Sequence, residues 1–142
     1  MKPTHKYLEH TADILFQAEA ESLPELFNEC ALAVEESQFD LSTVELNEEV
    51  KIKKENKQID LLLFDFLAEL LFYKDSEMLV LSEFKIDIIE DDDKFTLSCK
   101  AFGEKIDQEK HQPEVEVKAI TMHEFKVEKR SEGWFAQVLL DI

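Results

Sequence analysis

A chain of 142 residues, 44% of them hydrophobic, predicts a single domain over residues 1–142 with one hydrophobic core. Asp and Glu number 33 against 16 Lys and Arg, which gives a formal net charge of −17. Nucleic-acid binding depends on basic side chains that replace condensed counterions, so we expect no direct binding to RNA or DNA by the protein alone. The charge is commonly just a solvated surface, but it also suits a basic partner protein.

The first predicted elements are a strand and a helix. Apolar and polar side chains alternate over residues 13–20, which predicts a strand with one buried face. A helix over about 22–37 should follow, because Ser22 and Glu25 have the spacing of a capping box. Pro24 suits the first turn of that helix.

A further strand region and a second helix come next. Residues 44–53 alternate and predict one or two short strands. Asp60 is expected to cap a helix that runs to Tyr73. Because this helix is apolar on almost every side, it should lie buried among several neighbours.

The second half of the chain contains strand patterns without an intervening helix. Asp91–Asp93 should form a solvated turn between two of these strands, and Gly133 precedes the last one. The strand patterns cover 84–88, 95–101, 115–119, 125–127 and 134–141. Two early helices followed by consecutive strands predict an α+β fold, with two helices packed on a mostly antiparallel sheet.

The sequence also suggests where the protein resides. Cys30 and Cys99 lie on apolar faces and should be buried thiols, without the paired spacing of a disulfide framework. Met1–Tyr7 lacks the apolar region of a signal peptide. The apolar stretch Ile59–Tyr73 is shorter than the roughly 20 residues of a membrane span. We therefore expect a soluble, cytoplasmic protein.

The sequence contains no phosphate-binding loop, paired-cysteine metal motif or nucleophile motif of a known hydrolase class. Polar clusters remain at 10–13 and at 118–123. The first is also explained by turn chemistry. In the second, a period of two from Val117 would turn Thr121 and His123 toward the core, where a histidine is more often a packing residue than a ligand.

A third polar cluster lies at the C-terminus. Asp141 precedes Ile142, so a side-chain carboxylate and the α-carboxylate lie close together. If strands 13–20 and 134–141 pair antiparallel, Asp13 lies beside Asp141. Three carboxylates at one place would suit a hard divalent cation such as Ca²⁺ or Mg²⁺.

An ordered set of short motifs resembles the archease family along essentially the whole chain. The motifs are His10-Thr11-Ala12-Asp13-Ile14, Phe66–Tyr73, Gly103-Glu104, His111, Lys118–His123 and the terminal Asp141-Ile142. One departure is Leu15, where members of the family commonly have Gly.

The resemblance implies an accessory protein without catalytic activity of its own. Archeases activate the tRNA-splicing RNA ligase by promoting its guanylylation and repeated turnover. The resemblance implies that a metal ion, calcium or another divalent cation such as magnesium or manganese, is bound here by Asp13, Asp141 and Ile142. A chaperone-like modulator and a small metal-dependent hydrolase are the alternatives, and the roles of His10, Lys118, Thr121 and His123 stay open.

Overall fold

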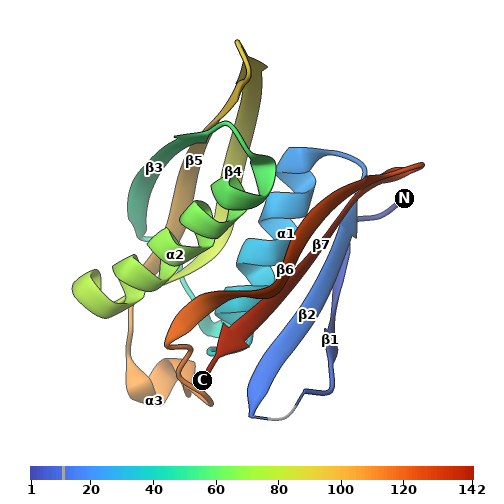
Figure 1. Ribbon diagram of the computed structural model, residues 1–142. Helices are drawn as coiled ribbons and strands as arrows, with labels where there is room; N and C mark the ends of the chain where they lie inside the picture. The colour runs from blue at the N-terminus through green and yellow to red at the C-terminus, as the bar shows by residue number, and fades with distance from the viewer. Residues whose placement is uncertain (11) are drawn as a thin grey trace.

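Two antiparallel sheets enclose two long helices in the computed structural model, which describes residues 1–10 and 12–142 (Figure 1). The strands are β1 (Thr4–Leu8), β2 (Asp13–Ala20), β3 (Glu48–Asn56), β4 (Leu79–Asp91), β5 (Lys94–Lys105), β6 (Ala119–Arg130) and β7 (Gly133–Asp141). The helices are α1 (Leu23–Glu36), α2 (Ile59–Glu77) and the short α3 (Gln108–His111). The predicted α+β class is confirmed, with the strands divided between two sheets.

The larger sheet has the strand order β1-β2-β7-β6, and the smaller has the order β3-β5-β4. Both α1 and α2 contact strands of both sheets, so the helices fill the space between them. Because β7 lies between β2 and β6, the last strand of the chain is an inner strand of its sheet. This position ties the C-terminal end firmly to the N-terminal half.

Strand β2 and helix α1 lie where the sequence predicts them. The Ser22 hydroxyl accepts a hydrogen bond from the Glu25 amide at 3.3 Å and donates one to the Glu25 carboxylate at 2.9 Å. These bonds satisfy a free amide in the first turn and fix the start of the helix. The unpredicted β1 adds to the outer edge of β2, and its mostly exposed side chains explain why no buried pattern marks it.

The second helix was predicted correctly in kind but not at its ends. Asp60 is not the cap: it lies in the first turn, where its carboxylate accepts from the neighbouring Leu61 amide at 2.9 Å. The helix begins after Gln58 and ends at Glu77, beyond Tyr73, where Met78 adopts a left-handed conformation with φ 55°. Its buried residues are Leu62, Leu63, Phe66, Leu67, Leu70, Leu71 and Lys74, which confirms burial on several sides.

Strand β3 begins later than expected. Residues 41–43 form a 3-10 turn capped by the Asp40 side chain, and Leu46 is exposed, so only the second part of the 44–53 pattern is strand. The hairpin between β4 and β5 is confirmed. Asp92 and Asp93 at its tip have φ values of 47° and 66°, the conformation that a two-residue hairpin turn requires.

The core lies between the sheets and contains both cysteines as buried free thiols, as predicted. Burial raises the pKa of Cys30, and raises that of Cys99 to about 12, so both thiols stay protonated at neutral pH. In the part of the chain that the structure describes, no helix has the length and hydropathy of a membrane span.

Candidate functional site

Two aspartates meet at one end of the larger sheet. Asp13 begins β2, Asp141 ends β7, and the antiparallel register makes them direct partners. Directly opposed residues point to the same face of a sheet, with Cα atoms roughly 4.5–5.5 Å apart. The predicted pairing of these two residues is therefore confirmed. Ala119 flanks Asp141 from the other side, on β6.

His10 links this pair to a third carboxylate that the sequence did not reveal. Its Nδ1 lies 3.7 Å from Asp13 Oδ2, and its Nε2 lies 3.4 Å from Glu124 Oε2. All three side chains remain partly exposed, with 28% of His10, 27% of Asp13 and 41% of Glu124 accessible. A histidine between two carboxylates can neutralise part of their charge when it is protonated.

Glu124 reaches this end of the sheet because β6 bulges. The pairing of β6 with β7 shifts between Thr121 and Lys126, and Glu124 has a positive φ of 58°. The Gln137 side chain donates to the Glu124 carbonyl at 2.9 Å and holds the bulge against β7. A bulge of this kind redirects a side chain without a signal in the hydrophobic pattern, which explains why sequence reasoning missed Glu124.

The same bulge overturns the expected inward orientation of two residues. His123 is exposed and Thr121 is only half-buried, whereas Ile120 is the residue that enters the core. The period of two fails because the segment before Ala119 is not yet strand and because the bulge interrupts β6. Thr121 instead accepts a local hydrogen bond from the His123 amide at 3.1 Å.

The donor set at Asp13 and Asp141 fits a hard divalent cation. Like charges on directly opposed strand residues repel, and a cation between them would remove that cost. Among residues 1–10 and 12–142, no cluster of three His, Cys, Asp or Glu side chains could hold a metal. A three-carboxylate site therefore needs the α-carboxylate of Ile142 beside the two aspartates, and it stays a prediction.

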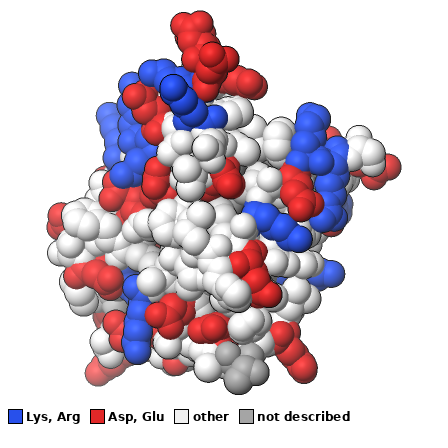
Figure 2. All heavy atoms as spheres, in the orientation of Figure 1, with Lys and Arg blue, Asp and Glu red and all other residues white. Residues whose placement is uncertain are grey.

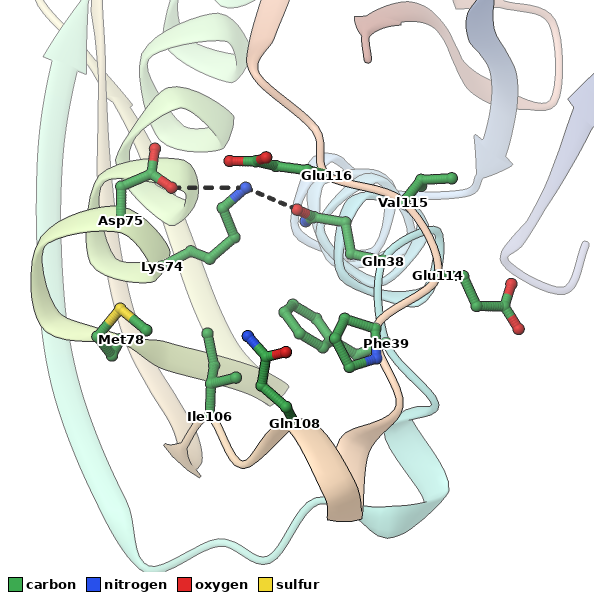
Figure 3. A pocket seen from close by; sticks show the side chains of 11 residues that line it. Gln38, Phe39, Lys74, Asp75, Met78, Ile106, Gln108, Glu114, Val115 and Glu116 are labelled. Carbon is green, nitrogen blue, oxygen red and sulfur yellow. Dashed lines mark hydrogen bonds and ion pairs between the residues drawn. The ribbon is translucent and has the colours of Figure 1, made fainter.

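A buried polar network holds the segment beside Asp141 in place. The Lys118 amide donates to the Asp141 carbonyl at 2.7 Å. Just before it, the Val117 amide donates to the Gln38 side chain at 3.2 Å, and the Val117 carbonyl accepts from Lys74 Nζ at 2.7 Å. Lys74 also donates to Gln38 at 2.8 Å (Figure 3). The hydrogen bonds of Lys74 and Gln38 thus hold the backbone in place just before Lys118, which contacts Asp141.

Lys74 and Gln38 also line a cavity of about 430 Å³, and Asp75 lies 3.6 Å from the ammonium group (Figure 3). Glu35 is fully buried, and its Oε2 has no hydrogen-bond partner among the described residues. Burial raises the pKa of Glu35 to about 8, although the Leu81 amide and the Lys74 charge oppose this shift. Glu35 is therefore mostly protonated at neutral pH.

A second polar cluster surrounds Glu104. Its carboxylate accepts from the Glu45 amide at 2.6 Å, from Lys110 Nζ at 2.9 Å and from His111 Nε2 at 3.1 Å. His111 Nδ1 accepts from the Asp107 amide at 2.9 Å, so the ring proton lies on Nε2 and points to Glu104. The hydrogen bonds from Glu45, Lys110 and His111 lower the pKa of Glu104 to about 2.

Gly103 is required beside Glu104, near the end of β5. A Cβ atom at this position would lie 1.8 Å from the Val80 carbonyl oxygen, next to the β4 bulge between Leu81 and Glu83. The Gly103-Glu104 and His111 motifs therefore belong to a structural cluster and not to the Asp13–Asp141 pair. Lys118 adjoins Asp141 through its backbone, whereas Thr11 lies outside the described residues.

The sequence matches the model of the archease protein family (MTH1598/TM1083) over residues 5–142. Proteins named archease are similar along nearly their whole length. That of Pyrococcus furiosus is 42% identical over 96% of this chain and 97% of its own, and that of Methanosarcina barkeri is 34% identical over 97% and 95%.

A solved structure has the same fold. The solution structure of Methanobacterium thermoautotrophicum protein 1598 is 38% identical, covers 97% of this chain and 98% of its own, and superposes with a TM-score of 0.87. Together with the family match, this agreement settles the assignment that the ordered motifs suggested. The chain belongs to the archease family.

Proposed function

We propose that this protein is an accessory factor that activates a tRNA-splicing RNA ligase, promotes its guanylylation and allows repeated turnover. The proposal includes a divalent cation, calcium in the first place, held by Asp13, Asp141 and the α-carboxylate of Ile142. The single observation that carries it is the register that opposes Asp13 to Asp141 in a chain of the archease family. The protein itself is proposed to catalyse neither ligation nor nucleotide hydrolysis.

The environment of the two aspartates supports a role in binding. Within the described part of the chain, His10 is the one ion-pair partner of Asp13, at 3.7 Å, and Asp141 has none. A fold that needed these carboxylates only for stability would pair them with Lys or Arg, as it does at Glu104. The unbalanced charge at this end is therefore available to a ligand.

Each residue of the site has a separate task in this proposal. Asp13 and Asp141 supply side-chain oxygens from paired inner strands, whose mutual hydrogen bonds fix the spacing of the two carboxylates. The Lys118 amide holds the Asp141 carbonyl and so limits the motion of the last two residues. When bound, the cation would supply positive charge to a phosphate or carboxylate in the ligase active site.

The acidity of the whole chain supports the choice of a protein partner. A net charge of −17 attracts the basic surface on which a nucleic-acid enzyme binds its substrate. Charge complementarity of this kind raises the rate of association, which then falls as salt screens it. We expect the ligase to bind more slowly at about 0.5 M salt than at about 0.1 M.

The test is ligase guanylylation with GTP, with and without this protein, followed by joining of an excess of RNA. Wild-type protein should raise both the rate of guanylylation and the number of turnovers. Asp141→Asn should abolish the gain, whereas Asp92→Asn at the exposed hairpin tip removes the same charge and should not. Ligase that is indifferent to wild-type protein would overturn the proposal, and GTP hydrolysis by the protein alone would favour a metal-dependent hydrolase.

A further inference from the structure

Four lysines occupy the middle of the outer face of the smaller sheet, on the side away from the helices. Lys51, Lys100 and Lys85 are direct register partners across β3, β5 and β4, and Lys53 lies two residues along β3. All four are exposed. We call these four residues the lysine face. Figure 2 shows Lys and Arg side chains gathered on the side of the molecule where β3 lies.

This arrangement is unfavourable for the isolated fold. Like charges on directly opposed strand residues destabilise a sheet. Within residues 1–10 and 12–142, no carboxylate lies within ion-pair distance of any of the four ammonium groups. The chain has 33 Asp and Glu, so acidic residues to pair with these lysines are abundant in its composition. A row of unpaired lysines in so acidic a protein therefore indicates an anionic ligand.

The surroundings of the lysine face suit a polyanion that also carries flat, apolar groups. A hollow of about 680 Å³ is lined by all four lysines and by Ser98. The Phe102 ring lies on the same face, with Lys85 Nζ 5.3 Å from its centroid. Asp87 is the acidic residue that lines the hollow, and the exposed Glu49 and Glu83 are the register partners of Phe102. Lysines for phosphates beside an aromatic ring for bases are the elements of a single-strand binding surface.

We propose that the lysine face binds the phosphate backbone of single-stranded RNA. The choice of RNA over other polyanions rests on the proposed function, since the ligase handles RNA ends. The face belongs to the β3-β5-β4 sheet and the Asp13–Asp141 pair to the other sheet, so both surfaces are available at once. In the complex, the acidic end faces the ligase and the lysine face contacts a flanking segment of its substrate.

The net charge of −17 repels RNA over long distances and makes binding by the protein alone weak at about 0.15 M salt. The test therefore measures binding of the protein alone to a single-stranded, unstructured RNA at roughly 20 mM salt, with fluorescence anisotropy as the readout. An RNA of about 12 nucleotides matches the site sizes of such surfaces. With three or four phosphate contacts, log K should fall against log salt with a slope of about −2 to −3.

The test variant is Lys51→Gln, Lys85→Gln and Lys100→Gln together. It should bind roughly tenfold more weakly at low salt and lose most of the salt slope. The control is Lys2→Gln, Lys6→Gln and Lys129→Gln, three exposed residues outside the smaller sheet, which give the same net charge. Binding by the control within about twofold of wild type supports the proposal, whereas equal losses in both variants would overturn it.

A second arm identifies the class of ligand. An oligoglutamate of equal charge should bind at least roughly tenfold more weakly than the RNA, because it lacks bases to stack on Phe102. Equal affinity would assign the face to an acidic protein segment and overturn the RNA proposal. Guanylylation without RNA should be stimulated equally by wild type and test variant, and its absence with wild type would refute the ligase role alone.

Discussion

Two acidic clusters of this protein are built in opposite ways. At Glu104, one carboxylate receives a backbone amide, a lysine and a histidine, and its pKa is lowered to about 2. At the end of the larger sheet, Asp13 faces Asp141, and the nearest basic group is His10 at 3.7 Å. In the first cluster, three donors surround one negative charge. In the second, two negative charges share the single basic neighbour His10.

The difference separates a structural cluster from a binding site. Glu104 joins β5 to α3 through Lys110 and His111, so its hydrogen bonds stabilise the fold. The side chains of Asp13 and Asp141 are not required to hold the strands together, because backbone hydrogen bonds already pair β2 with β7. The two like charges repel each other in the free protein, and their interaction becomes favourable only when a cation binds between them.

The largest effect is expected from Glu104→Ala. This variant leaves the fully buried His111 ring and the Lys110 ammonium without their acceptor, and we expect a loss of roughly 3 kcal/mol in unfolding free energy. Glu45→Ala, which removes an exposed side chain paired with the same Lys110, should cost less than about 1 kcal/mol. Urea unfolding measures both, and equal losses would contradict the assignment of Glu104 as the centre.

The same residue predicts how stability changes in acid. The pKa of Glu104 is lowered from 4.5 to about 2 by its hydrogen bonds, so the unfolded state binds its proton first as the pH falls. The stability it contributes is complete above pH 4.5 and is lost as the pH falls toward 2. Melting temperatures between pH 5 and about pH 2.5 should fall more steeply for wild type than for Glu104→Ala. Parallel curves would refute this.

A smaller effect is expected from Lys74→Met. Removing the ammonium group deprives Gln38 and the Val117 carbonyl of their buried donor, at a cost of roughly 2 kcal/mol. Amide exchange at Lys118 should accelerate, because the segment before Asp141 loses its anchor. Lys105→Met, an exposed residue with one bond to the Glu77 carbonyl, is the control and should change neither quantity by much.

The smallest effects on the metal-free fold are expected at the aspartate pair itself. Asp13→Asn and Asp141→Asn each relieve like-charge repulsion and should raise the unfolding free energy by roughly 0.2–1 kcal/mol. Each should also lose the rise in melting temperature that calcium gives the wild type, since ligands stabilise only the state that binds them. A destabilised Asp13→Asn would show that the carboxylate has a structural role instead.

The sequence predicted those features that follow from local chemistry or from strict periodicity. The Ser22 cap, the bounds of β2 and the turn at Asp92 and Asp93 are correct for that reason. The register of Asp13 with Asp141 followed because two strands of similar length each carry an Asp at one end.

Features that depend on tertiary packing were missed. Asp60 is a residue type that often caps a helix, but the N-cap is Gln58, two residues earlier, whose amide donates to the Asn56 side chain. The bulge that brings Glu124 to His10 has no period, so an argument from alternation placed Thr121 and His123 on the wrong face. The Glu104 cluster joins residues from three separate segments, and no single segment predicts it.

The most direct test of the metal site is a calcium titration of melting temperature for a chain extended by one alanine after Ile142. If the α-carboxylate is the third ligand, the extension turns it into a neutral carbonyl and should abolish most of the calcium-induced rise. An alanine added before Met1, at a distant point of the molecule, is the control (Figure 1). We expect a rise for wild type and control but not for the C-terminal extension, and an undiminished rise in the extended chain would contradict the proposed metal site.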